Sequence, residues 1–311
     1  MELDRTHVVI RKRMQTEIAD LALVMIRRYP SALFVGFTLG ALPWAVGNAV
    51  LLGWLPIREA AYGFGDQDAS SELFRYLAWM GLLVVAQAPA AGVWTTYFLG
   101  QAVFERQPTW SNVRREINRR FATWIWRLGV LRLPLVIMVL LLFRLGQPFN
   151  VSFDVVLYLF LGFLVVAIRS GRPFLPEVLL LEQCPAKSTD PRTVKLARRM
   201  RTLHHPVAGE LTSRMLLIAI GAFFAVIAIY FSLATVRGVL LGQWETDSVS
   251  LLVLYPLSLW LVAGWSVFFR LLSYLDTRIR LEGWEVELAV RAEELRQFDT
   301  EFPGGSSRQP A

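Results

Sequence analysis

Six long apolar runs, separated by polar and charged segments, dominate the pattern of this 311-residue chain. Each run is a candidate membrane span, because an α-helix needs roughly 20 residues to cross a hydrocarbon layer about 30 Å thick. The runs are Leu33–Leu55, Tyr76–Val103, Trp124–Phe143, Phe153–Ile168, Met215–Val236 and Leu251–Phe269. The pattern predicts an all-α fold, a polytopic membrane helix bundle with six transmembrane helices.

Lysine and arginine are concentrated in alternate connections between these runs. The N-terminal segment, the second connection, the fourth connection and the C-terminal tail are rich in them. The other three connections hold only Arg58 and Arg75, then Arg144, then Arg237. Since basic residues are retained on the cytoplasmic side, this alternation predicts that both termini are cytoplasmic. We therefore expect a multi-pass protein of a bacterial inner membrane.

The composition supports a membrane protein and changes how the net charge of +7 is interpreted. The chain is 55% hydrophobic and 18% charged, with a mean hydropathy of +0.45. Soluble domains are nearer one-quarter charged. The basic excess lies in the predicted cytoplasmic flanks, where anionic headgroups attract it. The predicted partners are therefore membrane lipids, through their anionic headgroups, and protein partners of unknown identity, but no nucleic acid.

Short amphipathic segments precede the first, third and fifth runs. Apolar residues at spacings of three and four form one face of each segment, and basic residues follow them or lie between them, which predicts helices lying in the cytoplasmic interface. The apolar positions are Ile18, Leu21 and Met25, then Trp110, Val113, Ile117, Phe121 and Trp124, then those within Val194–Met200. The chain can thus be interpreted as three hydropathy repeats of interfacial helix, span, outer turn and span.

The last apolar run continues into the charged segment Tyr274–Glu287, without a helix breaker before Gly283. We expect this segment to project into water as the same helix. The predicted organisation is a cytoplasmic N-terminal segment with an amphipathic helix (1–30) and a six-helix transmembrane domain (31–273). A cytoplasmic C-terminal helix (274–298) and a disordered tail (299–311) follow.

Arg132 is the strongest candidate for a functional charge within the membrane. It lies eight residues inside the third run, and only eleven uncharged residues separate it from Arg144. Either Arg132 faces the interior of the bundle, or it extends toward the cytoplasmic headgroups with Arg127. Pro134 follows and should kink this helix. Pro43, Pro89 and Pro256 lie in other runs. They indicate packing kinks or gating hinges.

Acidic residues below the fourth run suggest a polar cluster. Glu177 and Glu182 lie in a strongly apolar stretch. Isolated carboxylates would be costly there. We expect them to pair with Arg278 or Arg280, although they could instead face solvent. The candidate functional polar cluster is Arg132, Glu177, Glu182, Asp276, Arg278, Arg280 and Glu282.

Other polar and small residues in the runs indicate helix packing. Asn48 and Gln87 could hydrogen-bond across the bundle. Small residues in the second run would allow helices to approach closely. These small residues are Gly81, Ala86, Ala88, Ala90, Ala91 and Gly92.

The sequence predicts no catalytic, cofactor-binding or metal-binding residues, and hence no enzyme. Cys184 is the single cysteine. It can therefore form no intramolecular disulfide. His204 and His205 are adjacent and would point about 100° apart on a helix, which does not suit chelation of one metal. No nucleophile with a recognisable base and no glycine-rich phosphate loop is apparent.

Two segments resemble a known family. Tyr274–Glu287 has the pattern Tyr-x-Asp-x-Arg-x-Arg-x-Glu-Gly-aromatic-acidic-x-Glu, and Arg172–Pro185 runs from Arg-Pro-aromatic to Leu-Glu-x-x-Pro. Both resemble the membrane domain of glycerophosphodiester phosphodiesterases and its uncharacterised six-helix bacterial relatives. That family's catalytic domain has no counterpart in this sequence. The resemblance therefore implies a six-span bundle and no phosphodiesterase activity.

The favoured function is a structural or partner-binding component of a bacterial inner-membrane assembly, acting through its basic cytoplasmic face. The alternative is a transporter, channel or lipid-handling protein, with Arg132 and the kinked helices lining a path; an intramembrane enzyme comes third. A water-filled cavity that reaches Arg132 would favour the alternative. A dry, tightly packed bundle would favour the first function.

Overall fold

The computed structural model describes residues 14–55, 67–104, 108–145, 147, 150–185, 194–245 and 247–283. Helices form nearly all of these residues, and the described ranges contain no strand. The all-α class is therefore confirmed. The predicted tail 299–311 and residues 284–298 of the predicted C-terminal helix lie outside the described residues.

Five helices are long and apolar enough to cross a membrane, and a sixth span results if one bent pair is counted. The unbroken candidates are η2–α2 (Ala32–Leu52), α4 (Gln67–Ala91, apolar from Ser71), α9 (Val151–Gly171), α11–η5–α12 (Leu196–Leu241) and η6–α13 (Ser250–Glu282). The bent pair joins α7–η3 (Phe121–Val130) to α8 (Pro134–Leu145) at 56°. Several membrane-spanning helices are thus present, while the side on which each end lies stays a prediction.

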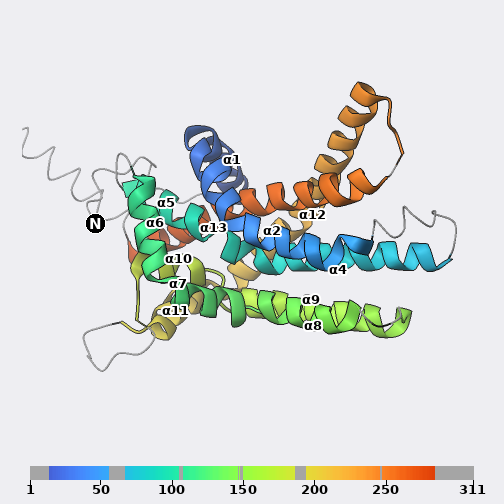
Figure 1. Cartoon of the computed structure of the whole chain (residues 1–311). Coiled ribbons are helices and arrows are strands. Elements are labelled where there is room, and N and C mark those ends of the chain that lie inside the picture. The colour runs from blue at the N-terminus through green and yellow to red at the C-terminus, as the bar shows by residue number, and fades with distance from the viewer. Residues whose placement is uncertain are drawn as a thin grey trace, which may run out of the picture.

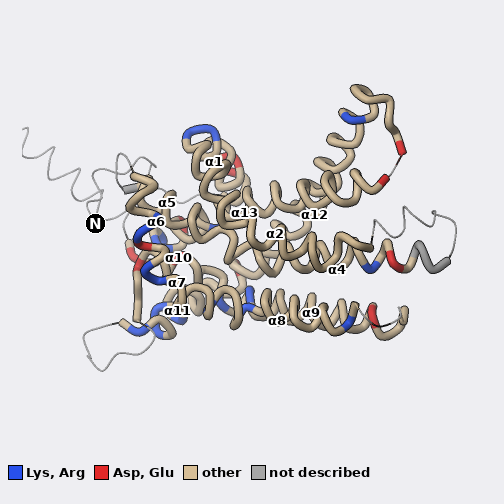
Figure 2. Tube along the Cα trace, in the orientation of Figure 1, with Lys and Arg blue, Asp and Glu red and all other residues tan. Residues whose placement is uncertain are grey.

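Short helices gather at one end of the bundle, here called the arginine-rich end. They are α5 (Val93–Phe104), α6 (Trp110–Arg119), α7 (Phe121–Trp124), α10 (Leu175–Glu177), η4 (Val178–Glu182) and α11 (Leu196–His204). The last turns of α13 (Tyr255–Glu282) reach the same end (Figure 1). Most of the described lysine and arginine residues also lie there (Figure 2).

The sequence suggested that the second apolar run forms one helix, but the structure divides this run between two helices. Helix α4 ends at Ala91 and α5 begins at Val93. A Cβ on the intervening Gly92 would lie 2.5 Å from Cγ2 of Val267, so the glycine lets α13 approach the break closely. Helix α5 then packs against η2, α6 and α13. The apolar length from 93 to 103 therefore serves the arginine-rich end.

The kink predicted at Pro134 is confirmed, and it is a complete break. Leu133 has a φ of 76°. Such a left-handed conformation costs a non-glycine residue roughly 1–2 kcal/mol. Proline disfavours helical backbone in the residue before it. Accordingly, α8 begins directly at Pro134. Pro43 and Pro89 lie inside intact helices, and Pro256 lies in the first turn of α13.

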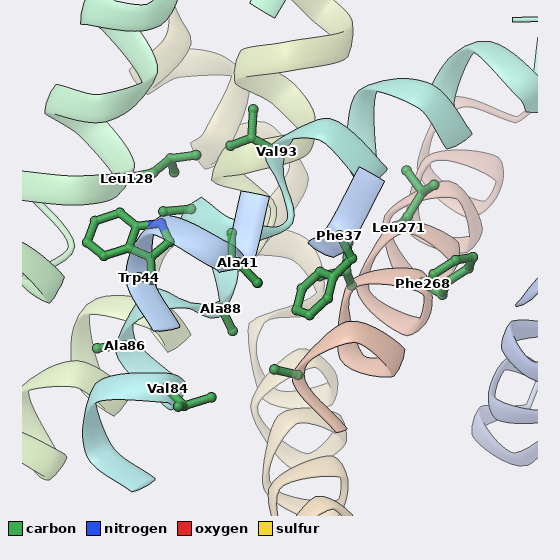
Figure 3. Packing of buried hydrophobic residues seen from close by; sticks show 14 of the residues in the cluster. Phe37, Ala41, Trp44, Val84, Ala86, Ala88, Val93, Leu128, Phe268 and Leu271 are labelled. Carbon is green, nitrogen blue, oxygen red and sulfur yellow. The ribbon is translucent and has the colours of Figure 1, made fainter. Parts of the chain in front are cut away.

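The core forms where η2 (Ala32–Phe37) and α2 (Thr38–Leu52) meet α4 and α13. Phe37, Ala41 and Trp44 are buried there, and Figure 3 shows Ala41 near Ala88 of α4 and Trp44 near Leu128. Asn48 and Gln87 exchange two buried hydrogen bonds of 2.8 Å, as the sequence predicted. Each amide thereby satisfies the other in an otherwise apolar contact.

The amphipathic helices bury most of their apolar positions against protein, while Phe121 of the second segment stays 54% exposed. Their place in the cytoplasmic interface stays a prediction. Helix α1 (Gln15–Arg28) buries Ile18, Ala22 and Met25 and packs on α13. Helix α6 packs on α5 through Val113 and Ile117, and α11 packs on η4 and α13. The basic faces of these helices stay exposed.

The charged end of α13 is also buried. The helix continues without interruption to Glu282 and ends at Gly283, whose φ is 67°, so the predicted continuity is confirmed. The predicted projection into water is wrong for Tyr274 and Asp276, which are 1% and 2% exposed. The segment from 274 to 283 belongs to the bundle, and its charges must be satisfied inside it.

We expect Gly40→Ala to destabilise the protein, because a Cβ at residue 40 would lie 2.0 Å from the carbonyl oxygen of Ala91. A backbone carbonyl group cannot move aside as a flexible side chain can. Overpacking of this kind lowers the free energy of unfolding by about 1–3 kcal/mol. The midpoint of thermal unfolding in detergent would fall. Gly162→Ala on α9 is the matched control, since nothing lies within 4 Å of its Cβ position. Equal midpoints for the two variants would contradict the close packing of α2 on α4.

Candidate functional site

A buried ion pair joins α13 to the short helix α10. The Nε atom of Arg270 donates to Oε1 of Glu177 at 2.5 Å, and its Nη2 atom reaches Oγ1 of Thr96 on α5 at 3.4 Å. Glu177 is fully buried and Arg270 is 8% exposed. Helix α10 begins at Leu175, has Pro176 in its first turn and carries Glu177 to the side chain of Arg270. The pair therefore links three elements at the arginine-rich end.

Arg132 lies at the break between η3 and α8 and faces the same region. Its side chain is 4% exposed, and its Nη2 atom donates to the carbonyl oxygen of Arg172. The charges of Arg169, Arg270 and Glu177 all act on it. Arg132 is thus inside the bundle, as one of the two sequence alternatives had it, and it does not extend toward the headgroups.

This group contains more positive than negative charge. The charges of Arg169 and Arg270 act on Arg132, and the one carboxylate that acts on it among the described residues is Glu177, which already pairs with Arg270. The Arg169 side chain donates to the carbonyl oxygen of Val85 at 2.7 Å, which supplies a dipole and no counter-charge. Within the described residues, Nε of Arg132 and Oε2 of Glu177 have no hydrogen-bond partner. Since burying an uncompensated charge is costly, this inner arginine group is electrostatically strained.

A second group on the same face of α13 is balanced. Glu182 accepts hydrogen bonds from Arg199 at 2.5 and 2.9 Å and from the hydroxyl of Tyr274 at 2.5 Å. Arg278 lies 3.7 Å from Glu182 and bonds Glu282, which also pairs with Arg199. Two arginines face two glutamates, so this group holds η4 and α11 against α13.

A third group lies on the other side of α13, toward α12 (Ala208–Leu241). Asp276 is 3.1 Å from both Arg214 and Arg280, and Glu210 binds the same two arginines at 2.5 and 2.8 Å. Arg214 is only 4% exposed. This balanced group fixes the start of α12 against α13.

The structure therefore separates the seven residues of the predicted polar cluster into three groups. The predicted pairing of Glu182 with Arg278 is confirmed, although Arg199 is its closer partner. The pairing of Glu177 with Arg278 or Arg280 is wrong, because α13 presents Arg270 to it two turns or more earlier.

The sequence interpretation missed Arg199, Arg214 and Arg270. Arg270, Tyr274, Arg278 and Glu282 follow one another at four-residue spacing. Residues at that spacing lie on one face of a helix. The spacing could therefore have shown that Arg270 shares the face of the predicted cluster.

The thiol of Cys184 lies beside the second group, where its Sγ donates to Glu182 at 3.8 Å. Burial raises the pKa of the Cys184 thiol, as does the nearby Glu182 carboxylate, so the thiol stays protonated at neutral pH. Within the described residues, no group of three or more His, Cys, Asp or Glu side chains could hold a metal ion. His204 ends α11 and His205 begins the next turn, η5 (His205–Val207).

Glu177→Gln should lower the free energy of unfolding by about 3 kcal/mol, the cost of leaving a buried charge without its partner. Denaturation of the purified protein in mixed micelles measures this. Glu116→Gln is the matched control, because Glu116 pairs with Arg119, whose side chain is 66% exposed. Surface pairs of that kind contribute at most about 1 kcal/mol.

The charge excess predicts the effect of a second substitution. Arg132→Gln added to Glu177→Gln should recover part of the lost stability, because it removes one of three mutually repelling guanidinium groups. The glutamine keeps a donor near the Arg172 carbonyl, to which Arg132 donates. A double variant less stable than Glu177→Gln alone would contradict the excess of positive charge in the inner arginine group.

Comparison with known proteins gives no relative for this arrangement. No family model, no curated protein and no solved structure matches the chain. The buried groups on α13 thus stand on their own geometry, without a known site to which they correspond.

Proposed function

We propose that this chain is a non-enzymatic integral membrane protein that serves as a structural or partner-binding component of a bacterial inner-membrane assembly. The observation that carries this proposal is the surface of α12, an apolar helix that the rest of the chain leaves almost uncovered. The sequence pointed to the basic face as the docking surface. The geometry favours α12, because the charges at the end of α13 are paired within the protein.

Helix α12 is held mainly near its two ends. Arg214 binds Asp276 near its start, and Arg237 binds Asp247 near its end at 2.5 Å. Hydrogen bonds from Arg237 hold the pKa of Asp247 below its usual value, so the carboxylate stays ionised and the Arg237–Asp247 ion pair persists at neutral pH. Between the two ends, none of the residues in the most apolar 18-residue window is buried. Figure 1 shows α12 crossing α13 and leaning away from α2 and α4.

The uncovered face of α12 contains small residues on one side of the helix. Gly221, Ala228, Ser232 and Thr235 are all exposed. Their spacings of seven, four and three place them on one face. In lipid, small residues permit close backbone contact between helices, which supplies the dispersion and polar contacts that drive association. A transmembrane helix of a partner suits this face.

The environment of Arg132 supports this proposal over the transporter or channel alternative. That alternative requires a watery path to Arg132, whereas Arg132 is 4% exposed and donates to backbone. The lipid-handling alternative has separate support, from a pocket described below.

We further infer that six spans cross the membrane and that the arginine-rich end and both termini are cytoplasmic. The alternation of basic connections supports this orientation. Membership of the six-helix group that Tyr274–Glu287 and Arg172–Pro185 resemble is likewise a proposal. Impermeant cysteine labelling of single-cysteine variants in intact cells tests the orientation; labelling at an introduced site near Arg201 from outside would overturn it.

Gly221→Leu should reduce co-purification of the partner about tenfold, because the added side chain separates the two helix backbones. Nothing lies within 4 Å of the Cβ position of Gly221, so the fold should be unaffected. Quantitative mass spectrometry after affinity purification in mild detergent measures the change.

Gly162→Leu makes the same substitution on α9, again with nothing within 4 Å of the Cβ position, and should leave the partner bound. Equal recovery with both variants would reject α12 as the docking helix. A variant that ends before Asp276 would not test α12 as the docking helix, because it lacks the buried partner of Arg214.

A further inference from the structure

A pocket of about 530 Å³ opens at the arginine-rich end, between the first part of the bent span and the segment that follows α10. One wall comes from the segment that includes α7 and η3 (Ile125–Val130) and carries Arg120, Trp124 and Arg127. The other wall comes from η4 and residues 183–185 and carries Leu179, Leu180 and Gln183. Both walls include π-helical turns. Such turns are frequent at functional sites.

Two arginines and no carboxylate line this pocket among the described residues. Arg120 is held in place, since it donates to Glu116 at 2.8 Å and to Gln183 at 2.5 Å. Arg127 makes no hydrogen bond or ion pair with the described part of the chain, and the like charge of Arg172 acts on it. The nearby Glu182 is occupied by Arg199 and Tyr274. Within the described part of the chain, the donors and the charge of Arg127 are therefore available to a ligand.

Trp124 supplies an aromatic part of the same wall. Its side chain lines the pocket and is only 8% exposed. Its indole Nε1 has under 1 Å² of accessible surface and no hydrogen-bond partner among the described residues, so this donor does not face the open space of the pocket.

The pocket is also partly apolar and adjoins a surface suited to a membrane interface. Leu179 and Leu180 supply aliphatic wall opposite the arginines. Phe121 and Trp126, on the same short helices, are 54% and 58% exposed. Aromatic residues concentrate where hydrocarbon meets headgroups. A ligand here meets a charged donor set and an apolar surface at once.

We propose that this pocket binds a phosphate ester attached to an apolar chain, namely the headgroup of an anionic phospholipid. The phosphate would lie against Arg127 and Arg120, and an acyl chain would run along Leu179 and Leu180. Guanidinium groups suit this role because they bind phosphate through paired, charge-assisted hydrogen bonds. This inference does not depend on α12 or on its partner.

The test uses the full-length protein, freed of co-purified lipid by detergent exchange, and native mass spectrometry with added lipid. Phosphatidylglycerol should bind at least tenfold more tightly than phosphatidylcholine. Arg127→Gln should weaken phosphatidylglycerol binding about ten- to a hundredfold, the value of one charge-assisted contact. The matched control for net charge is Arg114→Gln, at an exposed arginine of α6 outside the pocket. It should change the binding less than about twofold.

A second variant guards against misfolding of the first. Thr123 lines the pocket and is exposed, so the Thr123→Glu variant should fold. Its carboxylate should repel the phosphate and weaken phosphatidylglycerol binding as much as Arg127→Gln does. Arg127→Lys should recover part of the binding that Arg127→Gln loses, because the charge remains while the paired hydrogen bonds do not. Equal losses in Arg127→Gln and Arg114→Gln, or equal affinities for the two lipids, would overturn the site.

A competition arm separates a lipid from a soluble source of phosphate. Glycerol phosphate at millimolar concentration should not displace phosphatidylglycerol, because it makes no contact with Leu179 and Leu180. Displacement by glycerol phosphate at concentrations similar to the lipid would overturn the lipid assignment.

Discussion

The structure depends on one constraint: the last turns of α13 carry charges and are nevertheless buried. Water cannot satisfy the polar groups there, so each needs a partner from another element. Helices η4 and α11 bring Glu182 and Arg199 to one face, and the start of α12 brings Glu210 and Arg214 to another. Such pairs contribute little net stability over apolar packing, but breaking one is expensive. They therefore specify which elements pack against α13.

The inner arginine group departs from this balance, and a backbone break creates it. Because the bent span breaks between Val130 and Pro134, Arg132 turns into the bundle and meets Arg169 and Arg270 around Glu177. A continuous helix would have left Arg132 free to reach the headgroups. The left-handed backbone at the break and the excess of positive charge are both unfavourable, and stability alone would select against both.

The sequence predicted the features that follow from hydropathy and local chemistry. Long apolar runs specify spans whatever their neighbours are, and Pro134 breaks a helix through its own ring. Asn48 and Gln87 hydrogen-bond to each other because each lies in an apolar run that offers few other polar partners. The predictions that failed concern contacts between distant segments. Nothing local in Glu177 distinguishes Arg270 from Arg278, because the choice depends on how far α10 lies along α13. The amphipathic faces of α1 and α6 could equally cover lipid or protein by pattern alone.

The pocket was not apparent in the sequence because it, too, depends on contacts between distant segments. Its walls come from residues 120–127 and 179–185, which are far apart along the chain and share no motif. They meet because α5, freed from α4 by the break at Gly92, packs against α6 on one side and η4 on the other. The second apolar run thus provides more than a span, since its last eleven residues position both walls. If α4 and α5 formed one continuous helix, α6 and η4 would lose this shared support, and Arg127 would no longer face Leu179 and Leu180.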